Sequence, residues 1–318
     1  MTLFRFSNRI LSAFALSAAV AVPAQALERL DFTVASGGKD LKKAIQSNSL
    51  LQAAKIADET APNDLLATAQ ADYGRILETL YGEGYYSAVI HIYIDGREAA
   101  SIGPFAAPSV INVITVVVEP GRLFHFGETG VAPLPKGTKT LPEFGKGEVA
   151  RSTVVRSAVS EGITGWREAG YAKVTVQNQG VVADHRDATL DANIALATGP
   201  RVTFGDLIRT TPSAVREERI RKIANFPSGE VFSPKALEAV AERLRKTGAF
   251  SSVSLREAKT LGPGDTLDVE LTVADEKPHR FGAGAELSSF DGLMLSGFWM
   301  HRNLLGGAER FRIDGKIS

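Results

Sequence analysis

The stretch "GAFSSVSLRE", residues 248–257, decides the fold of this chain because two counterparts precede it. They are "GYAKVTVQNQ" from Gly170 and "GYYSAVIHIYI" from Gly84, so successive glycines lie 78 and 86 residues apart. Each stretch joins a glycine to an aromatic residue and to an alternating run that is typical of a β-strand. We interpret Gly248 as the left-handed residue that ends a preceding helix. The chain is therefore expected to repeat one helix-to-strand unit.

Two further marks recur at nearly the same interval. Phe-Gly occurs at 126–127, 204–205 and 281–282, each time a few residues after a turn such as "EPG", "TGP" or "DEKP". The triplet "GEV" occurs in "KGEVARSTVV" from Lys146 and in "SGEVFSPKAL" from Ser228, at a spacing of 82. A period of about 80 residues is too long for a solenoid repeat and long enough for a small core. The sequence therefore predicts a tandem array of small domains.

Each unit shows helical spacing before its glycine and alternating strands after it. In the third unit, Ser233 and Pro234 are expected to start a helix that continues through Leu237 and Leu244. We expect a Phe-Gly strand to open each unit, which gives the order strand, helix, helix, strand, strand and an α+β class. Helices would cover one face of such a sheet and leave at least one edge open.

The predicted divisions of the chain follow from these marks. They are 1–26 for a signal peptide, 27–121, 122–200 and 201–278 for three domains, and 279–318 for a different C-terminal segment. In the predicted signal peptide, Arg5 and Arg9 precede an apolar run of 13 residues, and Ala24-Gln25-Ala26 is the expected cleavage site. An uncleaved anchor is the alternative, but the run is shorter than the roughly 20 residues that span a bilayer.

From Arg280 the pattern changes to three extended runs separated by "FDG" and "NLLGG". The first run has Phe281 and Leu287 on one side, and the last, "RFRIDGKI", alternates charged with apolar residues. Both sides of the middle run carry apolar residues, so its faces stay unassigned. Such alternation near glycines and Trp299 is typical of a barrel with a lipid-facing outside and a wet inside. The alternative is a soluble hairpin from a fourth domain.

Together these marks resemble a known family. The three units, with their glycine-aromatic strands and a turn before Phe-Gly, resemble POTRA domains, the periplasmic modules of outer-membrane assembly proteins. The stretch "GFWMHRNLLGGAERFRI" is similar to the first strands of the surface-antigen barrel that follows POTRA domains, where a tryptophan precedes Arg-Asn-Leu and a glycine pair. Three units favour a TamA-like outer-membrane assembly protein. A family barrel has many more strands than three, so the resemblance implies a chain truncated inside its barrel.

The resemblance implies a place in the outer membrane of a Gram-negative bacterium, with the POTRA domains in the periplasm. It implies insertion or translocation of outer-membrane β-barrel proteins and autotransporters as unfolded clients, an inner-membrane-anchored TamB-like partner, and outer-membrane lipid around a full barrel. A two-partner secretion transporter and a fragment of a general barrel assembly factor are the alternatives within the family. A soluble periplasmic interaction scaffold is the alternative of another class.

An open sheet edge suits many clients because its backbone groups can add an incoming strand without reading its sequence. The expected client-binding edges are 86–94, 171–177 and 251–257. Candidate edge residues are Tyr86, Ala88, Ile90, Tyr171, Lys173, Thr175, Val253 and Leu255. Motif residues with a structural role are Gly84, Gly170, Gly248, Phe126, Gly127, Phe204, Gly205, Phe281, Gly282, Trp299, Arg302 and Asn303.

Composition disfavours other classes of function. Lysine plus arginine equals aspartate plus glutamate at 36 each, which argues against nucleic acid, and the absence of cysteine removes disulfides and thiolate chemistry. The five histidines are scattered without metal-ligand spacing, and neither a G-x-S-x-G nor a P-loop pattern occurs. His91 is expected in a strand, and Asp184, His185 and Asp187 in a solvated loop. We predict no enzyme activity, catalytic residue, metal site or cofactor.

Overall fold

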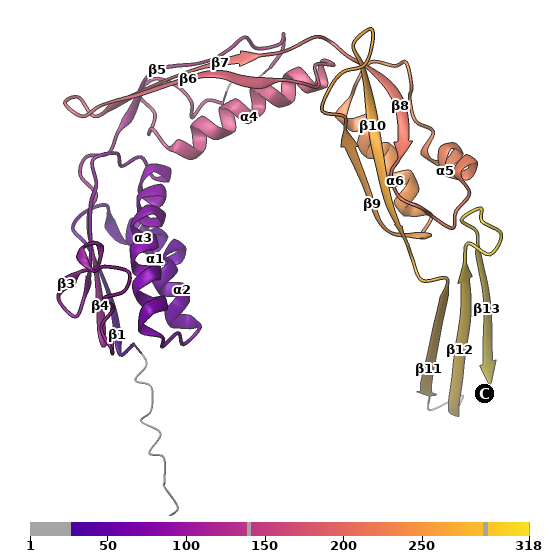
Figure 1. Cartoon of the computed structure of the whole chain (residues 1–318), viewed down its shortest axis with the longest axis horizontal. Helices are drawn as coiled ribbons and strands as arrows, with labels where there is room; N and C mark the ends of the chain where they lie inside the picture. Colours follow the sequence, from indigo (N-terminus) through magenta and orange to yellow (C-terminus); the bar gives the residue numbers. More distant parts are fainter. Residues whose placement is uncertain (1–26, 139–140, 289–291, 318) are drawn as a thin grey trace, which may run out of the picture. The chain divides into compact units, whose positions relative to one another are not determined.

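The computed structural model describes residues 27–138, 141–288 and 292–317 (Figure 1). The predicted signal peptide, residues 1–26, lies outside them. We name residues 27–121 module 1, 122–200 module 2, 201–278 module 3, and 279–317 the C-terminal sheet. The described strands form four sheets, one in each of these parts. One compact unit of the chain holds module 1 without residues 82–84 and extends to Arg122; the other holds these three residues and the chain from Leu123 onward.

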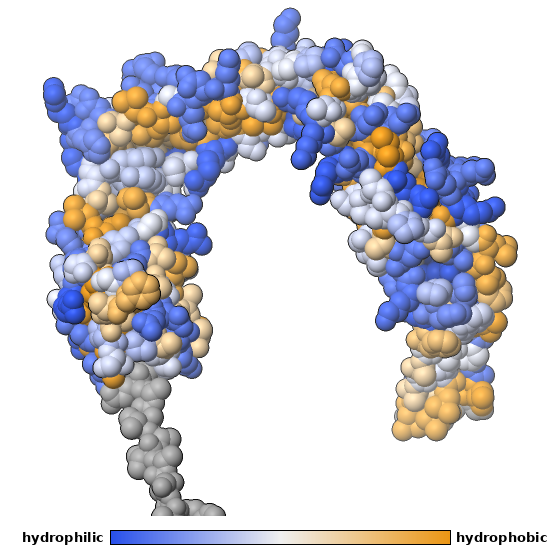
Figure 2. Space-filling model, viewed as in Figure 1, coloured by the Kyte–Doolittle hydropathy of each residue, from blue (hydrophilic) through white to orange (hydrophobic). Residues whose placement is uncertain are grey.

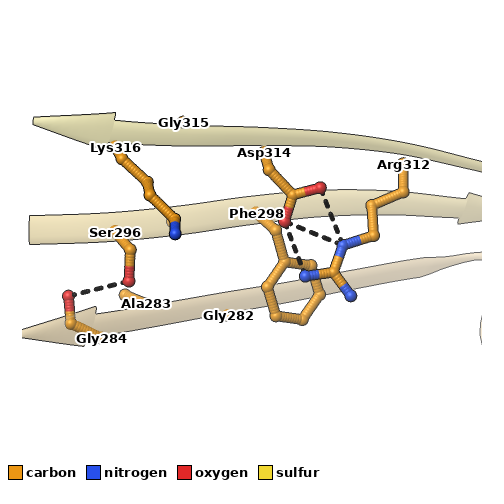
Figure 3. Close-up of a pocket in the computed structure, with 10 residues that line it drawn as sticks. Gly282, Ala283, Gly284, Ser296, Phe298, Arg312, Asp314, Gly315 and Lys316 are labelled. Atoms are coloured by element: carbon orange, nitrogen blue, oxygen red, sulfur yellow. Dashed lines mark hydrogen bonds and ion pairs between the residues drawn. The ribbon is translucent and has the colours of Figure 1, made fainter.

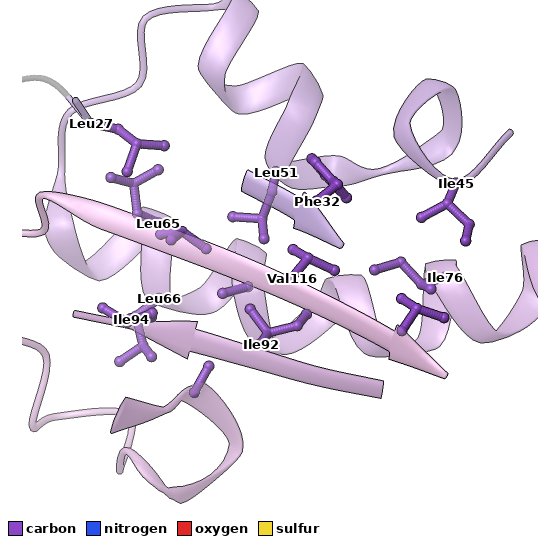
Figure 4. Close-up of a cluster of buried hydrophobic side chains, with 14 of the residues drawn as sticks. Leu27, Phe32, Ile45, Leu51, Leu65, Leu66, Ile76, Ile92, Ile94 and Val116 are labelled. Carbon is purple, nitrogen blue, oxygen red and sulfur yellow. The ribbon is translucent and has the colours of Figure 1, made fainter. Parts of the chain in front are cut away.

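Module 1 packs helices against a four-stranded sheet of order β1-β4-β2-β3, in which β1 and β4 are parallel and β2 and β4 antiparallel. Its elements are β1 (Arg29–Val34), α1 (Gly38–Asn48), α2 (Leu50–Ile56), α3 (Pro62–Gly82), β2 (Val89–Ile94), β3 (Arg97–Glu98), the 3-10 helix η1 (Ala99–Ser101) and β4 (Val113–Glu119). Phe32 and Val116 on the sheet meet Leu65 and Ile76 of α3 in the buried core (Figure 4).

Module 1 therefore has three α-helices in its described residues, where two were predicted. The extra boundary lies at Ser49, whose extended backbone separates α1 from α2. Its hydroxyl accepts a hydrogen bond from the Gln52 N–H (3.1 Å), and the buried Asp72 carboxylate accepts from the Ser49 hydroxyl (2.6 Å) and the Leu50 N–H (2.7 Å). These bonds satisfy the first amides of α2 and start a new helix.

Module 3 has the predicted order of elements. They are β8 (Thr203–Arg209), α5 (Glu217–Ala224), α6 (Pro234–Lys246), β9 (Phe250–Glu257) and β10 (Thr266–Asp275). The sheet order is β8-β10-β9, with β8 parallel and β9 antiparallel to the central strand. The structure confirms Ser233 as the N-cap of α6, accepting from the Ala236 N–H at 3.4 Å, and Gly248 as a left-handed residue with φ 67°.

Module 2 has the same sheet order, β5-β7-β6, but the predicted second helix is wrong for its described residues. Its elements are β5 (His125–Ala132), α4 (Ser152–Glu168), β6 (Thr175–Asp184) and β7 (Thr189–Ala197). Only 11 residues separate Ala132 from Phe144, whereas 16 separate Arg209 from Phe226 in module 3. The shorter segment also contains three prolines, which cannot donate within a helix. It has neither the length nor the composition for a counterpart of α5.

The Phe-Gly pair creates a bulge at the start of modules 2 and 3. Phe126 and Phe204 are each 1% exposed. Directly after them, the register shifts in the parallel pairing of β5 with β7 and of β8 with β10. Asp191 accepts a hydrogen bond from the Glu128 N–H (2.7 Å), and Asp268 accepts from the Asp206 N–H (2.8 Å). A side chain at Gly127 or Gly205 would collide with these carboxylates. The pair thus combines a buried anchor with room for an aspartate.

These aspartates belong to a repeat that our sequence reading missed. "TLD" occurs at 189–191 and again at 266–268, at the same spacing as the other marks. Phe144 and Phe226 were missed as well, although each lies three residues before the glycine of "GEV". Their rings pack on Phe126 and Phe204 at centroid distances of 5.3 and 5.1 Å.

The "GEV" segment pairs with the strand that opens its own module. In module 2 the Phe126 N–H donates to the Glu148 carbonyl (2.8 Å), and the Gly147 N–H donates to the Phe126 carbonyl (2.8 Å). Phe204, Glu230 and Gly229 repeat both bonds in module 3, at 2.8 and 2.7 Å. This segment therefore closes the outer edge of β5 and β8 where each strand begins.

The third Phe-Gly does not open a further module, so its assignment to the same motif is wrong. Phe281 is 74% exposed and lies in β11 (His279–Ser288), which pairs antiparallel with β12 (Gly292–Arg302). Gly282 faces the Phe298 ring instead of an aspartate. β13 (Arg310–Ile317) completes this sheet in the order β11-β12-β13, and no described helix packs on either face (Figure 1).

We predict that Gly205→Ala destabilises module 3 by about 1–3 kcal/mol, since the new methyl group displaces the Asp268 carboxylate from the Asp206 N–H. Native-state hydrogen exchange of the β10 amides measures this loss within module 3. Asp268→Ala should lower the free energy of unfolding less in the Gly205→Ala variant than in the parent chain, because both substitutions remove the same hydrogen bond.

Gly74→Ala is the matched control, because nothing lies within 4 Å of a methyl group at this exposed position of α3. It should be neutral or stabilise α3 by up to about 1 kcal/mol. Equal effects of the two alanine substitutions would contradict the role given to Gly205.

Candidate functional site

The candidate site is the set of sheet edges formed by the strands that follow the recurring glycines. β6 and β9 are edge strands of their sheets. On the side away from β4, β2 is bordered by the two-residue β3, which pairs with Tyr93 and Ile94. Of the candidate residues, Ile90 lies in β2, Thr175 in β6, and Val253 and Leu255 in β9. All three strands therefore present some backbone at a border.

Four candidate residues lie outside the strands: Tyr86, Ala88, Tyr171 and Lys173. The strands start later than predicted because the glycine turns first close the preceding helices. Gly84 and Gly170 have φ values of 92° and 101°. The N–H of the residue after each glycine returns to a helix carbonyl, from Tyr85 to Leu80 (2.8 Å) and from Tyr171 to Trp166 (3.0 Å).

Three of these residues have other contacts. The Tyr86 ring stacks on Tyr81 at 4.9 Å, and the Tyr171 ring packs edge-on against Trp166 at 4.8 Å. Lys173 donates through Nζ to the Ala258 carbonyl (2.6 Å) and thereby joins module 2 to module 3. These contacts give them roles in packing.

The β2 edge of module 1 is closed at Ile92 by two side chains. The Ile92 N–H donates to the Tyr73 hydroxyl oxygen and to the Glu98 carboxylate, both at 3.2 Å, and the Tyr73 hydroxyl lies 3.3 Å from the Ile92 carbonyl. Tyr73 and Glu98 are also hydrogen-bonded to each other, and His91 Nδ1 lies 3.0 Å from the carboxylate. An incoming strand would have to displace this group from the backbone.

The ionisation of both residues reflects this arrangement. Burial, followed by the hydrogen bond to the Glu98 carboxylate, raises the pKa of Tyr73 to about 12. Burial also opposes ionisation of Glu98, but hydrogen bonds from Tyr73, Ile92 and His91 outweigh it and lower the pKa of this carboxyl group. We call the Tyr73 and Glu98 side chains on the Ile92 backbone a plug. At neutral pH it consists of an ionised Glu98 and a neutral Tyr73.

Side chains contact the β9 edge of module 3 at two places, near Val253 and at Glu257. Arg245 of α6 donates through Nη2 to the Val253 carbonyl at 3.4 Å. Glu257, at the end of β9, is paired with Arg167 from α4, and Lys173 donates to the next carbonyl, that of Ala258. Contacts between modules 2 and 3 therefore use the end of this edge.

The β6 edge of module 2 has no such cover among the described residues. Its side chains are exposed along nearly the whole strand, because α4 packs on β5 and β7. Val176, Val181 and Val182 are large apolar side chains that remain at least 41% exposed. No charged residue occurs from Thr175 to Ala183, although charges are a common protection of natural edges.

The C-terminal sheet has one apolar face. The strand register shows which residues of the middle strand, β12, lie on it. Phe281, Trp299 and Ile313 lie opposite one another, as do Ala285, Leu295 and Ile317. Beside the half-buried Trp299, seven large apolar side chains of this face are 47–81% exposed: Phe281, Leu287, Leu293, Leu295, Phe311, Ile313 and Ile317. Hydrophobic residues gather visibly over this sheet (Figure 2).

The opposite face carries the charged side chains of the sheet, beside apolar residues from β12. Arg312 pairs with Asp314 (3.0 Å) and lies over the Phe298 ring at 4.1 Å, beside Ser296 and Lys316 (Figure 3). Gly282 leaves the space that the Phe298 ring occupies. The alternation predicted for the first and last strands is thus confirmed. β12 does not share it, because Met294, Phe298 and Met300 lie on the same face as Arg312 and Asp314.

The remaining motif residues support this sheet. Trp299 donates through Nε1 to His279 Nδ1 (3.2 Å), Arg302 donates to the Lys277 carbonyl (3.2 Å), and the Asn303 side chain accepts from the Ala308 N–H (3.0 Å). Arg310 donates to the carbonyls of Lys246 (2.6 Å) and Thr247 (2.7 Å) at the end of α6. The start of β13 is thereby attached to module 3.

Residues 27–138, 141–288 and 292–317 contain no group of three or more His, Asp or Glu that could hold a metal ion. In the same ranges, no helix has the length and apolarity to cross a membrane.

We predict that module 1 loses stability as the pH falls from the ordinary pKa of a glutamate, about 4.3, through the lowered pKa of Glu98. A carboxyl group with a depressed pKa in the folded state stabilises it only while ionised, so this contribution is complete above that range. Hydrogen exchange of the Ile92 amide against pH measures it. Glu98→Gln should remove the loss of stability at acid pH, and Tyr73→Phe should make it smaller. An unchanged loss of stability in Glu98→Gln would contradict the role given to Glu98.

Comparison with known proteins identifies the module type. The family model described as "POTRA: Surface antigen variable number repeat" matches residues 203–274, which span module 3 from β8 to β10. No curated protein sequence matches the chain.

Two solved structures share the fold at low sequence identity. POTRA domains 3–5 of BamA from Haemophilus influenzae superpose with a TM-score of 0.54 at 17% identity, covering 79% of this chain and 96% of that one. BamA from Haemophilus ducreyi lacking POTRA domains 1–3 gives 0.52 at 16% identity and covers 61% of this chain. The chain spans 37% of the length of that second structure. The described chain is an α+β protein of POTRA fold, and its residues 203–274 match the POTRA family itself.

Proposed function

We propose that this chain belongs to a TamA-like outer-membrane assembly protein and acts in the insertion or translocation of outer-membrane β-barrel proteins. In this proposal the POTRA-fold modules lie in the periplasm, and the C-terminal sheet forms the first strands of a transmembrane β-barrel. The observation that carries it is the uncovered apolar face of the C-terminal sheet, directly after the POTRA domain of module 3.

The two faces of this sheet favour a lipid boundary. One face carries exposed aromatic and aliphatic side chains on all three strands, and the other carries Arg312, Asp314 and Lys316. Transmembrane barrels alternate apolar residues toward lipid with polar residues toward the interior. A soluble protein rarely leaves such a large apolar patch in water. Only three residues link Asp275 of β10 to His279 of β11, so the sheet follows module 3 closely.

The finer parts of the proposal come from the sequence resemblance. Autotransporters would be among the unfolded clients, an inner-membrane-anchored TamB-like protein would be a partner, and the client would bind a POTRA module by strand addition. The three sheets with a strand order that leaves edges, together with the POTRA match, support this mode of binding.

The proposal predicts that the apolar face of the C-terminal sheet enters lipid. The chain has two tryptophans, so Trp166→Phe leaves Trp299 as the single indole reporter on that face. Its emission should be quenched by brominated lipid when the full chain is added to vesicles. Ile313→Arg should weaken vesicle binding about tenfold or more, because burial of one large aliphatic side chain contributes about 1.5–3 kcal/mol.

Phe298→Arg on the opposite face is the matched control and should bind vesicles like the parent chain. If brominated lipid left Trp299 emission unchanged and Ile313→Arg had no effect, the soluble periplasmic scaffold would be the better account.

A further inference from the structure

We propose that β6 of module 2 is the edge that receives a client strand, and that side-chain plugs close the corresponding edges of modules 1 and 3. This inference rests on the proposed function, in which an extended client adds to a POTRA sheet. It goes further in assigning the docking edge to one strand and in naming the chemistry of the segment that fits there.

The three edges differ in how their backbone groups are occupied. In module 1, Tyr73 and Glu98 hold the N–H of Ile92. In module 3, Arg245 holds the Val253 carbonyl. Within the described residues, no side chain makes an equivalent bond to the backbone of β6. An added strand gains main-chain hydrogen bonds, so it gains most where no internal partner must first be displaced.

The edges of modules 2 and 3 also differ at one equivalent position, which is Val181 on β6 and Glu257 on β9. Val181 pairs with Ala192, the residue after Asp191, and Glu257 pairs with Val269, the residue after Asp268. Since both aspartates hold the same place in the "TLD" repeat, Val181 and Glu257 hold the same place on their edges. Module 3 has a carboxylate there that is paired with Arg167, whereas module 2 has a valine that is 42% exposed.

The surroundings of β6 define the segment that fits. β6 has 10 residues, against 6 in β2 and 8 in β9, so it offers the longest of the three edges. Val176 and Val181 pair with Leu196 and Ala192, which are buried, so they share the sheet face that α4 covers over β7. A client strand beside β6 would place every second side chain next to these valines. It should therefore be uncharged and apolar at alternate positions.

Binding of a synthetic strand to the full chain in detergent micelles tests this assignment. The probe is a ten-residue uncharged peptide in which valine alternates with serine, and its control replaces the valines with glutamate. Fluorescence anisotropy of the labelled probe gives its affinity. Val181→Glu, which puts into module 2 the charge that module 3 carries, should weaken binding at least tenfold. Ile208→Glu, a matched change at a 46% exposed residue of β8, should leave it unchanged.

A photo-crosslinking version of the probe locates the contact. The expected crosslinks fall within 175–184, and Arg245→Ala should add crosslinks to β9 by freeing the Val253 carbonyl. Unchanged affinity in Val181→Glu, or crosslinks in β2 or β9 of the parent chain, would overturn the assignment of β6. No new β9 crosslinks in Arg245→Ala would overturn the role of Arg245 as a plug.

Two other results have defined meanings. If sedimentation showed a dimer of the parent chain that Val181→Glu converts to a monomer, the occupant would be a second copy of the chain, which overturns the client assignment. Quenching of Trp299 by brominated lipid does not depend on β6. Quenching without peptide binding would therefore contradict this inference alone, and peptide binding without quenching would contradict the proposed function alone.

Discussion

Backbone N–H and C=O groups at the border of a small sheet need partners, and this constraint shapes each module. A three-stranded sheet has two edge strands for every central one, so much of its backbone faces outward. The chain satisfies part of it internally: the "GEV" segments pair with the starts of β5 and β8, and Asp191 and Asp268 hold amides freed by the bulges. Within the described residues, no side chain holds the outer backbone of β6, and this is why we propose it as the docking edge.

Residues that shape the backbone of each module recur along the chain, whereas residues that contact the outer sheet edges vary between modules. Marks that fix backbone geometry recur, namely the left-handed glycine, the Phe-Gly bulge and "TLD". The residues that close or leave open the outer edges differ between modules: Tyr73 and Glu98 in module 1, none among the described residues of module 2, and Arg245 in module 3. A repeated scaffold can thus present three edges of different availability.

Local chemistry explains how much was predictable from sequence. The N-cap Ser233, the left-handed Gly248 and the amphipathic strands near the C-terminus depend on neighbours in the chain, and each was predicted. The helix missing from module 2 could have been anticipated from three prolines in a short segment. The plug of module 1 could not, because Tyr73 meets Ile92 across 19 positions, and neither could the pair of Arg167 with Glu257, which spans 90. The third Phe-Gly misled because the dipeptide alone does not show that its strand pairs antiparallel with the next strand and not parallel within a module.

Hydrogen exchange of individual amides, with and without an uncharged alternating peptide, tests the central claim most directly. The account predicts that the Ile92 amide is protected in the free chain, while the outward half of the β6 amides exchanges freely and becomes protected only when the peptide is added. Protection of all β6 amides in the free chain, or peptide-induced protection confined to β2 or β9, would contradict it.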